Sequence, residues 1–92
     1  MDLDKLRAFA AVALEGNITR AARRLNTSQP AVSKQVSELE ESLGTALFDR
    51  LPRGVRLTEA GHVLLHHTQQ ILAAERSAEN EIAELTGLTR GK

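Results

Sequence analysis

Gln29, Ser33 and Lys34 are side chains that can hydrogen-bond to the edges of nucleobases. An amide can bond adenine through two groups, an ammonium can reach the acceptors of guanine, and a hydroxyl can bond either kind of base. The surrounding residues, 17–37, contain four basic side chains and no acidic one. These groups favour a surface that binds DNA. The alternative is an ordinary solvated face of a small helical domain.

The first element expected to position these groups is a helix that begins near residue 18. Its apolar residues recur at i, i+3, i+4 and i+7, which is the spacing of one buried helical face. They are Ile18, Ala21, Ala22 and Leu25. Arg20, Arg23 and Arg24 lie on the opposite face. Asn26 and Thr27 then interrupt the pattern, which predicts a very tight turn.

A second helix is predicted after this turn, with Ser28 as its N-cap and Pro30 in its first turn, where the missing N–H costs no hydrogen bond. Its buried face consists of Val32, Val36, Leu39 and Leu43. Its other face begins with Gln29, Pro30, Ser33, Lys34 and Ser37, and Gly44 supplies the left-handed residue that ends it. Because a short turn makes two helices cross steeply, the N-terminal half of this helix projects outward. The sequence therefore predicts a helix-turn-helix over about residues 18–37.

A chain of 92 residues is expected to form one small domain, near the lower limit of what buries an adequate core. Aromatic residues make up only 2% of it, so the core must be aliphatic, and a partner chain would add to it. The lack of cysteine excludes a disulfide framework and fits a reducing cytoplasm. Residues 1–16 are not expected to be a signal peptide, because two acids precede an apolar run that Lys5 and Arg7 interrupt. No apolar run approaches the roughly 20 residues of a membrane span.

The formal net charge of zero does not exclude DNA binding, because the distribution of charge matters more than its sum. Residues 1–56 hold nine basic and seven acidic side chains, whereas residues 57–92 hold three and five. The basic residues concentrate in 20–34 and 50–56. Glu38, Glu40 and Glu41 fall at the far end of the second helix, away from the predicted contact surface.

A helix over residues 2 to about 15 is predicted to be a core element without chemistry of its own. Its buried stripe is expected to consist of Leu3, Leu6, Ala10, Ala13 and Leu14. The ring of Phe9 is expected to pack near this stripe. Asp2 and Asp4 lie at the positive end of the helix, where acidic residues are favoured, and Gly16 ends it.

Two brief extended segments are predicted to form a small β-hairpin over about residues 46–57, with Pro52 and Gly54 in its tip. A hairpin this short is stable only when it packs on helices. Arg53 at the tip is suited to a narrow A·T minor groove, which attracts arginine. For Arg50 and Arg56, contact with DNA and pairing with water or nearby acids both stay open.

A long helix is predicted from residue 59 to about 86, with Thr58 as its N-cap. At about 1.5 Å per residue it spans roughly 40 Å, which is more than a domain of this size can cover. A seam of apolar and small residues recurs along it at spacings of three and four, comprising Leu64, His67, Ile71, Ala74, Ala78, Ile82 and Leu85. The seam favours a second copy of the same helix, and the alternative is packing on its own domain or on downstream residues. Residues 87–92 are expected to be disordered.

His62, His66 and His67 lie within a turn and a half of this helix. The first two have a spacing that could share a metal ion, but no third ligand follows at a suitable spacing, so neither a metal site nor a cofactor is predicted. Surface or seam histidines are expected instead, with a mildly pH-sensitive dimer as the consequence. An enzyme is not predicted, because no nucleophile–base pair or phosphate-binding glycine loop is present. A protein-interaction module that uses only the long helix stays open as a second function.

Several short motifs, in this order, resemble the LysR-type transcriptional regulators. They are AARRL at 21–25, SQPAVSKQV at 28–36, LFDR at 47–50 and LTEAG at 57–61, together with Leu6, Phe9, Ala13, Gly16, Leu39, Glu40, Leu43, Gly44 and Arg53. The resemblance extends from residue 2 to about 85. It implies a mainly α fold in which a winged helix-turn-helix, residues 1–58, has three helices and a short β-hairpin wing. A long dimerisation or linker helix, residues 59–86, follows.

The resemblance further implies sequence-specific binding of double-stranded DNA at inverted-repeat promoter sites, as a homodimer through the long helix. The residues implied to contact bases are Gln29, Pro30, Ser33, Lys34 and Arg53. Those implied to contact phosphates are Arg20, Thr27, Ser28, Ser37 and Arg50. The dimer interface is expected at Leu64, His67, Ile71, Ala74, Ala78 and Ile82.

Members of the family are usually much longer and have an effector-binding domain after the linker helix. These 92 residues are therefore expected to be a DNA-binding fragment, in which a small-molecule inducer would act only through an absent domain. The family's usual serine before the first helix of the motif is Asn17 here, and both residues cap helices. Pro52 is expected to stiffen the tip of the wing.

Overall fold

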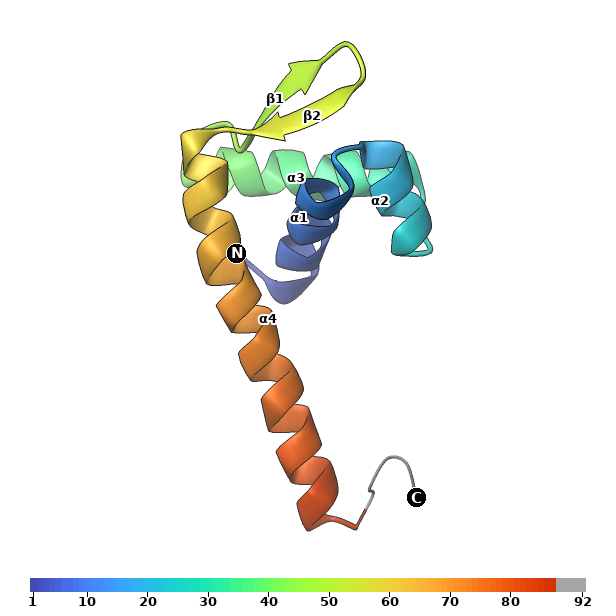
Figure 1. Ribbon diagram of the computed structural model, residues 1–92, viewed down its shortest axis with the longest axis vertical. Coiled ribbons are helices and arrows are strands. Elements are labelled where there is room, and N and C mark those ends of the chain that lie inside the picture. The colour runs from blue at the N-terminus through green and yellow to red at the C-terminus, as the bar shows by residue number, and fades with distance from the viewer. Residues whose placement is uncertain (88–92) are drawn as a thin grey trace.

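The structure, a computed structural model, describes residues 1–87. Its elements follow the order α1, α2, α3, β1, β2, α4 (Figure 1). Their bounds are α1 Leu3–Glu15, α2 Ile18–Arg24, α3 Gln29–Leu43, β1 Phe48–Leu51, β2 Gly54–Leu57 and α4 Glu59–Leu85. The predicted mainly helical fold, with one antiparallel hairpin between the third and fourth helices, is confirmed.

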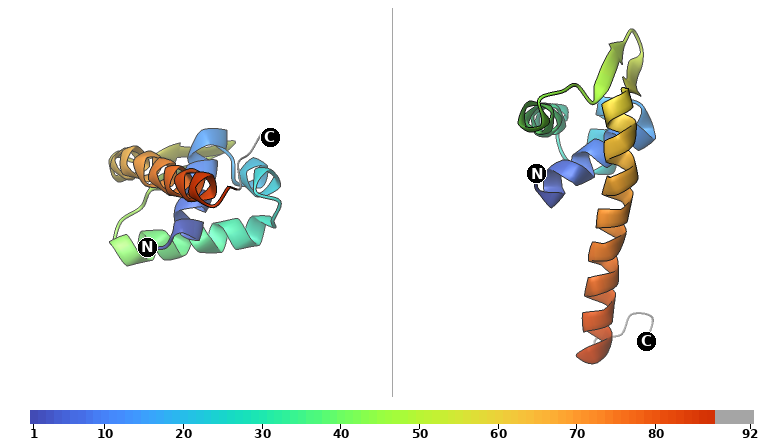
Figure 2. Two further views of the ribbon diagram at one scale, coloured as in Figure 1. Left: turned by 90° about the horizontal axis from the view of Figure 1, so that it is seen from below. Right: turned by 90° about the vertical axis from the view of Figure 1, so that its left-hand side faces the viewer.

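The helices α2 and α3 and the hairpin lie at one end of the molecule, and the second half of α4 projects from the other end (Figures 1 and 2). The molecule is correspondingly elongated, with extents of 49 × 24 × 17 Å. Helix α1 packs against α2, α3 and α4, so it is the element that joins the helix-turn-helix to the long helix. Among residues 1–87, no helix combines the length and apolar character that crossing a membrane would require.

The core is aliphatic, as its composition predicts, and centres on one aromatic pair. Phe9 of α1 is fully buried, and its ring centroid lies 5.3 Å from that of Phe48 in a tilted arrangement. Such a pair stabilises a core beyond the area that it buries. Val12, Val32, Val36, Leu39 and Leu47 are the other large apolar side chains that are fully buried.

The predicted stripe on α1 is partly wrong. Leu6 is buried, but Leu14 is 68% exposed, and Leu3, Ala10 and Ala13 are only half-buried. The buried residues are Leu6, Ala8, Phe9, Ala11 and Val12. Because three helices pack around α1 from different sides, its buried positions do not form a single stripe.

The predicted helix ends are confirmed at both kinds of cap. The side-chain oxygens of Asp2, Asn17, Ser28 and Thr58 accept hydrogen bonds from backbone N–H groups three residues later. Gly16 and Gly44 end α1 and α3 with φ values of 68° and 73°, which favour glycine. Leu43, expected in the core, is instead 42% exposed, because it lies at the end of α3 beside a groove described below.

The hairpin packs on the turn between α1 and α2. Phe48 pairs with Leu57 and Leu51 with Gly54, which places Pro52 and Arg53 at the tip. The N–H of Val55 donates to the carbonyl oxygen of Gly16 at 3.0 Å. The wing is therefore held by the helical body, as a hairpin of this length requires.

Helix α4 begins where the wing ends, and Thr58 joins the two elements. Its hydroxyl donates to the carbonyl oxygen of Ala46 at 2.7 Å and accepts from the N–H of Gly61 at 3.0 Å. Its own N–H donates to the carbonyl oxygen of Leu47 at 2.9 Å. Further along α4, Leu64 and Leu65 pack against the core. The rest of the helix beyond Glu75 is mostly exposed.

Thr68 of α4 is fully buried, and its hydroxyl has no hydrogen-bond partner among residues 1–87. A buried hydroxyl without a partner destabilises the folded state. We expect Thr68→Val, which replaces the hydroxyl with a methyl group of similar size, to increase the free energy of unfolding by about 1 kcal/mol. Thermal denaturation would show this as a rise in Tm of about 4–8 °C.

The matched variant is Thr68→Ala, which removes the hydroxyl but also leaves a space in the core. We expect it to melt below Thr68→Val, because its cavity costs packing energy. A Thr68→Val protein less stable than the wild type would show that the hydroxyl is bonded in solution.

Candidate DNA-binding interface

The N-terminal half of α3 exposes the side chains predicted to contact bases. Gln29, Pro30 and Lys34 are exposed and Ser33 is half-buried. Ser37, one turn further along, is exposed as well. Because Val32, Val36 and Leu39 anchor the opposite face in the core, the polar face of this helix is free for a ligand.

The side chain of Gln29 is oriented by a residue that the sequence did not single out. The hydroxyl of Thr19, in the first turn of α2, donates to the amide oxygen of Gln29 at 3.3 Å. This bond leaves the amide nitrogen of Gln29 free to donate and one lone pair of its amide oxygen free to accept. The two residues are ten positions apart and meet only because α2 and α3 cross, so no local pattern signals the contact.

The turn between α2 and α3 fixes their crossing. Asn26 adopts a left-handed conformation with φ 61°, which asparagine tolerates better than most residues. The N–H of Thr27 then donates to the carbonyl oxygen of Ala22 at 2.9 Å. Thr27 and Ser28 are both exposed beside the start of α3, so their hydroxyls lie next to the residues predicted to contact bases.

The arginines of α2 line a shallow cleft with Glu15. The cleft has a volume of about 480 Å³ and is lined by Glu15, Arg20, Arg23 and Arg24. Arg24 forms an ion pair with Glu15 at 3.1 Å. Within residues 1–87, no ion pair involves Arg20 or Arg23, so these two guanidinium groups are available to an anion such as a phosphate.

The wing adds a second group of arginines. Arg53 is exposed at the tip, and neither it nor Arg50 has an acidic partner within the described part of the chain. Arg56 faces Asp49 across the two strands, with 3.9 Å between guanidinium nitrogen and carboxylate oxygen. The structure therefore distinguishes Arg56, which has a counter-charge, from Arg50 and Arg53.

Glu40 fixes the base of the wing relative to α3. Its carboxylate accepts hydrogen bonds from the backbone N–H groups of Leu47 at 2.7 Å and Phe48 at 3.3 Å. This carboxylate lies away from the polar face of α3, as the sequence predicts. It bonds the chain at the start of β1, so it positions the hairpin.

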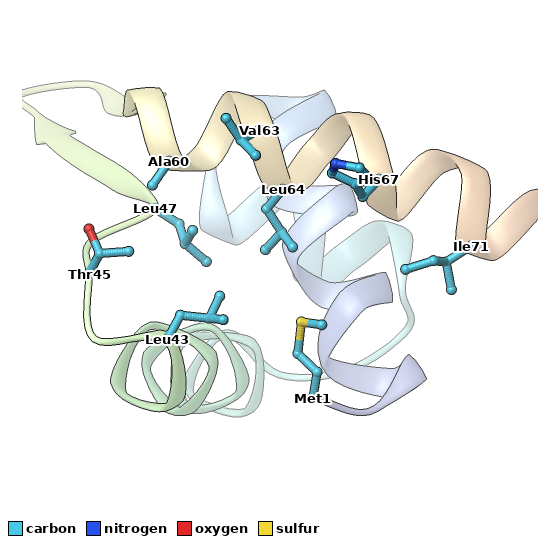
Figure 3. A pocket seen from close by; sticks show the side chains of 9 residues that line it. All are labelled: Met1, Leu43, Thr45, Leu47, Ala60, Val63, Leu64, His67 and Ile71. Atoms are coloured by element: carbon cyan, nitrogen blue, oxygen red, sulfur yellow. The ribbon is translucent and has the colours of Figure 1, made fainter.

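An apolar groove lies between α4, the end of α3 and the N-terminus (Figure 3). It has a volume of about 520 Å³ and is lined by Met1, Leu43, Thr45, Leu47, Ala60, Val63, Leu64, His67 and Ile71. Three residues of the predicted seam, Leu64, His67 and Ile71, therefore line the groove. The other predicted interface residues, Ala74, Ala78 and Ile82, are exposed, as is Leu85. All of these except Ala74 lie on the projecting part of α4 beyond Glu75.

The histidines of α4 are close together without forming a metal site. The rings of His66 and His67 meet edge to face with centroids 5.2 Å apart. Among residues 1–87, no group of three or more histidine, cysteine or acidic side chains is placed to hold a metal ion.

Comparison with known protein families decides the identity of this arrangement. Residues 3–62 match the family described as "Bacterial regulatory helix-turn-helix protein, lysR family". The chain belongs to the LysR family. The match covers α1, the helix-turn-helix, the wing and the start of α4.

Curated LysR-family relatives include a RuBisCO operon transcriptional regulator of Allochromatium vinosum, which is 45% identical over 91 residues, 99% of this chain and 30% of the relative. The HTH-type transcriptional regulator BudR of Klebsiella aerogenes is 47% identical over 91 residues, which are 99% of this chain and 62% of the length of BudR. The chain thus spans between about a third and two thirds of these relatives' length. Both relatives are named as transcriptional regulators.

Solved structures agree with this assignment. The protein chain of a BenM_DBD/catB site 1 DNA complex matches with a TM-score of 0.90 at 34% identity. The match covers 94% of the present chain and 97% of the chain in that complex. The protein chain of a CbnR_DBD–DNA complex matches with a TM-score of 0.83 at 42% identity. This match covers 92% of the present chain and 99% of the chain in the complex. The LysR-type winged helix-turn-helix is therefore confirmed as the fold.

Proposed function

We propose that this chain binds double-stranded DNA sequence-specifically as the N-terminal domain of a transcriptional regulator, at inverted repeats and as a homodimer. The observation that supports it best is the exposed polar face of α3, which carries Gln29, Ser33 and Lys34. The hairpin and α2 lie at the same end of the molecule (Figure 1), and they expose arginines that have no acidic partner within residues 1–87. The proposal places α3 in a major groove and Arg53 in the neighbouring minor groove. Since the ligand is chromosomal DNA, it also places the protein in the cytoplasm.

The proposed contacts divide into two kinds. Gln29, Pro30, Ser33, Lys34 and Arg53 would contact bases, and Arg20, Thr27, Ser28, Ser37 and Arg50 would contact phosphates. All but Ser33 are exposed, and Ser33 is half-buried. Phosphate contacts supply much of the affinity of such a complex, so binding should weaken steeply as salt is raised.

The homodimer would form through the seam of α4 and the apolar groove beside it. A nearly wholly apolar groove of about 520 Å³ is continuous with exposed seam residues on the same helix. A second copy of α4, which presents the same apolar residues, would cover both. Two copies of α3 would then reach half-sites on one face of the duplex.

Gln29→Ala is the variant that tests base recognition. We expect it to lower discrimination at particular bases by about 1–3 kcal/mol, because a bidentate amide contact is lost. The measurement is selection of bound duplexes from a random pool at two salt concentrations. Ser33→Ala is expected to change preference at a different base of the half-site.

Arg20→Ala serves as the control for this experiment. A lost phosphate contact should weaken binding to all sequences alike and reduce the salt dependence, with base preferences unchanged. If Gln29→Ala and Ser33→Ala both retained the wild-type preferences, the assignment of α3 as the reading element would be refuted.

A further inference from the structure

We propose that the ion pair between Arg7 of α1 and Glu75 of α4 sets the angle of α4 to the winged helix-turn-helix, and thereby the half-site spacing that the dimer accepts. The inference rests on the dimeric DNA binding proposed above. It gives a specificity role to two residues that are neither among the predicted DNA contacts nor among the predicted interface residues, although Glu75 follows Ala74 at the edge of the seam.

The pair joins residues 68 positions apart in the sequence. Nη2 of Arg7 lies 2.6 Å from both carboxylate oxygens of Glu75, and Nη1 lies 2.9 Å from a carboxylate oxygen of Asp4. The guanidinium is therefore held at both ends, by its own helix and by α4. Charged bonds of this kind are shorter and stronger than neutral ones and are directional.

The guanidinium stays charged throughout the physiological pH range. Its hydrogen bond to Glu75 raises the pKa of Arg7 above its already high ordinary value, and the charges of Glu75 and Asp4 act in the same direction. Partial desolvation opposes these effects. The side chains of Arg7 and Glu75 are 41% and 24% exposed, so water and salt screen the pair only in part.

Glu75 lies where α4 leaves the rest of the molecule. Nearer the start of the helix, Gly61 and Thr68 are buried and Leu64 and Leu65 pack on the core. From Arg76 to Leu85, nine of the ten residues are exposed. The ion pair therefore connects α1 to the last part of α4 that lies against it, and the helix beyond projects freely (Figure 1).

Because Glu75 lies far from the start of α4, a small change in the angle of the helix moves Glu75 by several ångströms. Glu75 is 14 residues beyond Gly61, about 21 Å along the helix. A tilt of about 10° at Gly61 would move α4 by about 4 Å at Glu75, comparable with the rise of about 3.4 Å per base pair. Because the two winged domains of a dimer are joined through α4, such a tilt changes the distance between the two α3 helices.

The test compares the 92-residue wild type with Arg7→Gln, Glu75→Gln and the double variant. Each is bound to duplexes that contain the two selected half-sites separated by spacers of varied length. In the wild type, we expect one spacer to bind best. In each single variant, the Kd for a spacer one base pair longer, divided by the Kd for the best spacer, should fall about three- to fivefold.

Three further results distinguish positioning from a general loss of structure. The base preferences within each half-site should not change, because α3 is untouched. The double variant should match the single variants, because both remove one interaction. Glu79→Gln, one turn further along on the exposed part of α4, should keep the wild-type spacing preference.

Retention of the wild-type spacer ratio in both single variants would overturn the inference, as would additive losses in the double variant. Loss of half-site base preference in the variants would also overturn it, since the pair would then support the fold of the reading surface. A different result would contradict the proposed function itself: the wild type would then show no sequence preference on a duplex with any spacer.

Discussion

Ile71→Glu is expected to convert the proposed dimer to a monomer and to weaken binding to a complete inverted repeat by about 100-fold. Ile71 is 36% exposed and lines the apolar groove together with Leu64 and His67 (Figure 3). A carboxylate placed there would be desolvated without a partner when a second chain covers the groove. The monomer would lose the effective concentration that a joined second half-site supplies, which is the source of the large loss.

Light scattering measures the mass of this variant, and titration of a complete and a single half-site measures its affinity. Affinity for a single half-site should change little, because the groove that Ile71 lines lies beside the C-terminal end of α3 and not beside its polar N-terminal half. The matched control is Ala73→Glu, two residues away and about 200° around the helix, at another exposed position. An Ile71→Glu protein that stays dimeric would show that the interface lies elsewhere on the chain.

The helices of this fold could be predicted well from the sequence, because capping residues mark where each helix begins or ends. Asn17, Ser28 and Thr58 accept the bonds that their types favour at N-caps, and Gly16 and Gly44 take the left-handed conformation expected of them. Such signals depend on residues within one turn of each other, so they can be read from the order of the residues alone.

The predictions that failed concern which face is buried, and they failed for a tertiary reason. Leu14 and Leu43 have the spacing of core residues but are 68% and 42% exposed. Ala8 and Ala11 of α1 are buried outside the predicted stripe. A hydrophobic periodicity describes packing against one neighbour, whereas α1 has three helical neighbours.

The contacts that position the candidate site could not be read from the sequence. Thr19 reaches Gln29 across the helix crossing, Glu40 bonds the start of the wing, and Arg7 reaches Glu75 over 68 positions. Each depends on the distance between elements, which residue order alone does not supply. The residues predicted to contact DNA could be proposed from the sequence, because their chemistry is a property of the side chain itself.

Gly61→Ala is expected to lower the free energy of unfolding by about 2–3 kcal/mol, although alanine is the better helix former. Gly61 lies in the first turn of α4 and is buried. A Cβ atom at this position would overlap the carbonyl oxygen of Leu47 and press on the side chain of Leu57. Helix propensity alone would instead predict a gain of about 1 kcal/mol, so the two explanations differ in sign.

The carbonyl of Leu47 cannot move aside easily, because it accepts the N–H of Thr58 at 2.9 Å and therefore helps to hold the wing against α4. Chemical denaturation would measure the loss of stability. Gly44→Ala is the control, since a Cβ at Gly44 meets nothing within 4 Å and costs only the strain of its φ of 73°. A Gly61→Ala protein more stable than the wild type would contradict this prediction. It would show that α4 and the carbonyl of Leu47 are far enough apart to accept a Cβ atom, so that close packing does not require glycine at position 61.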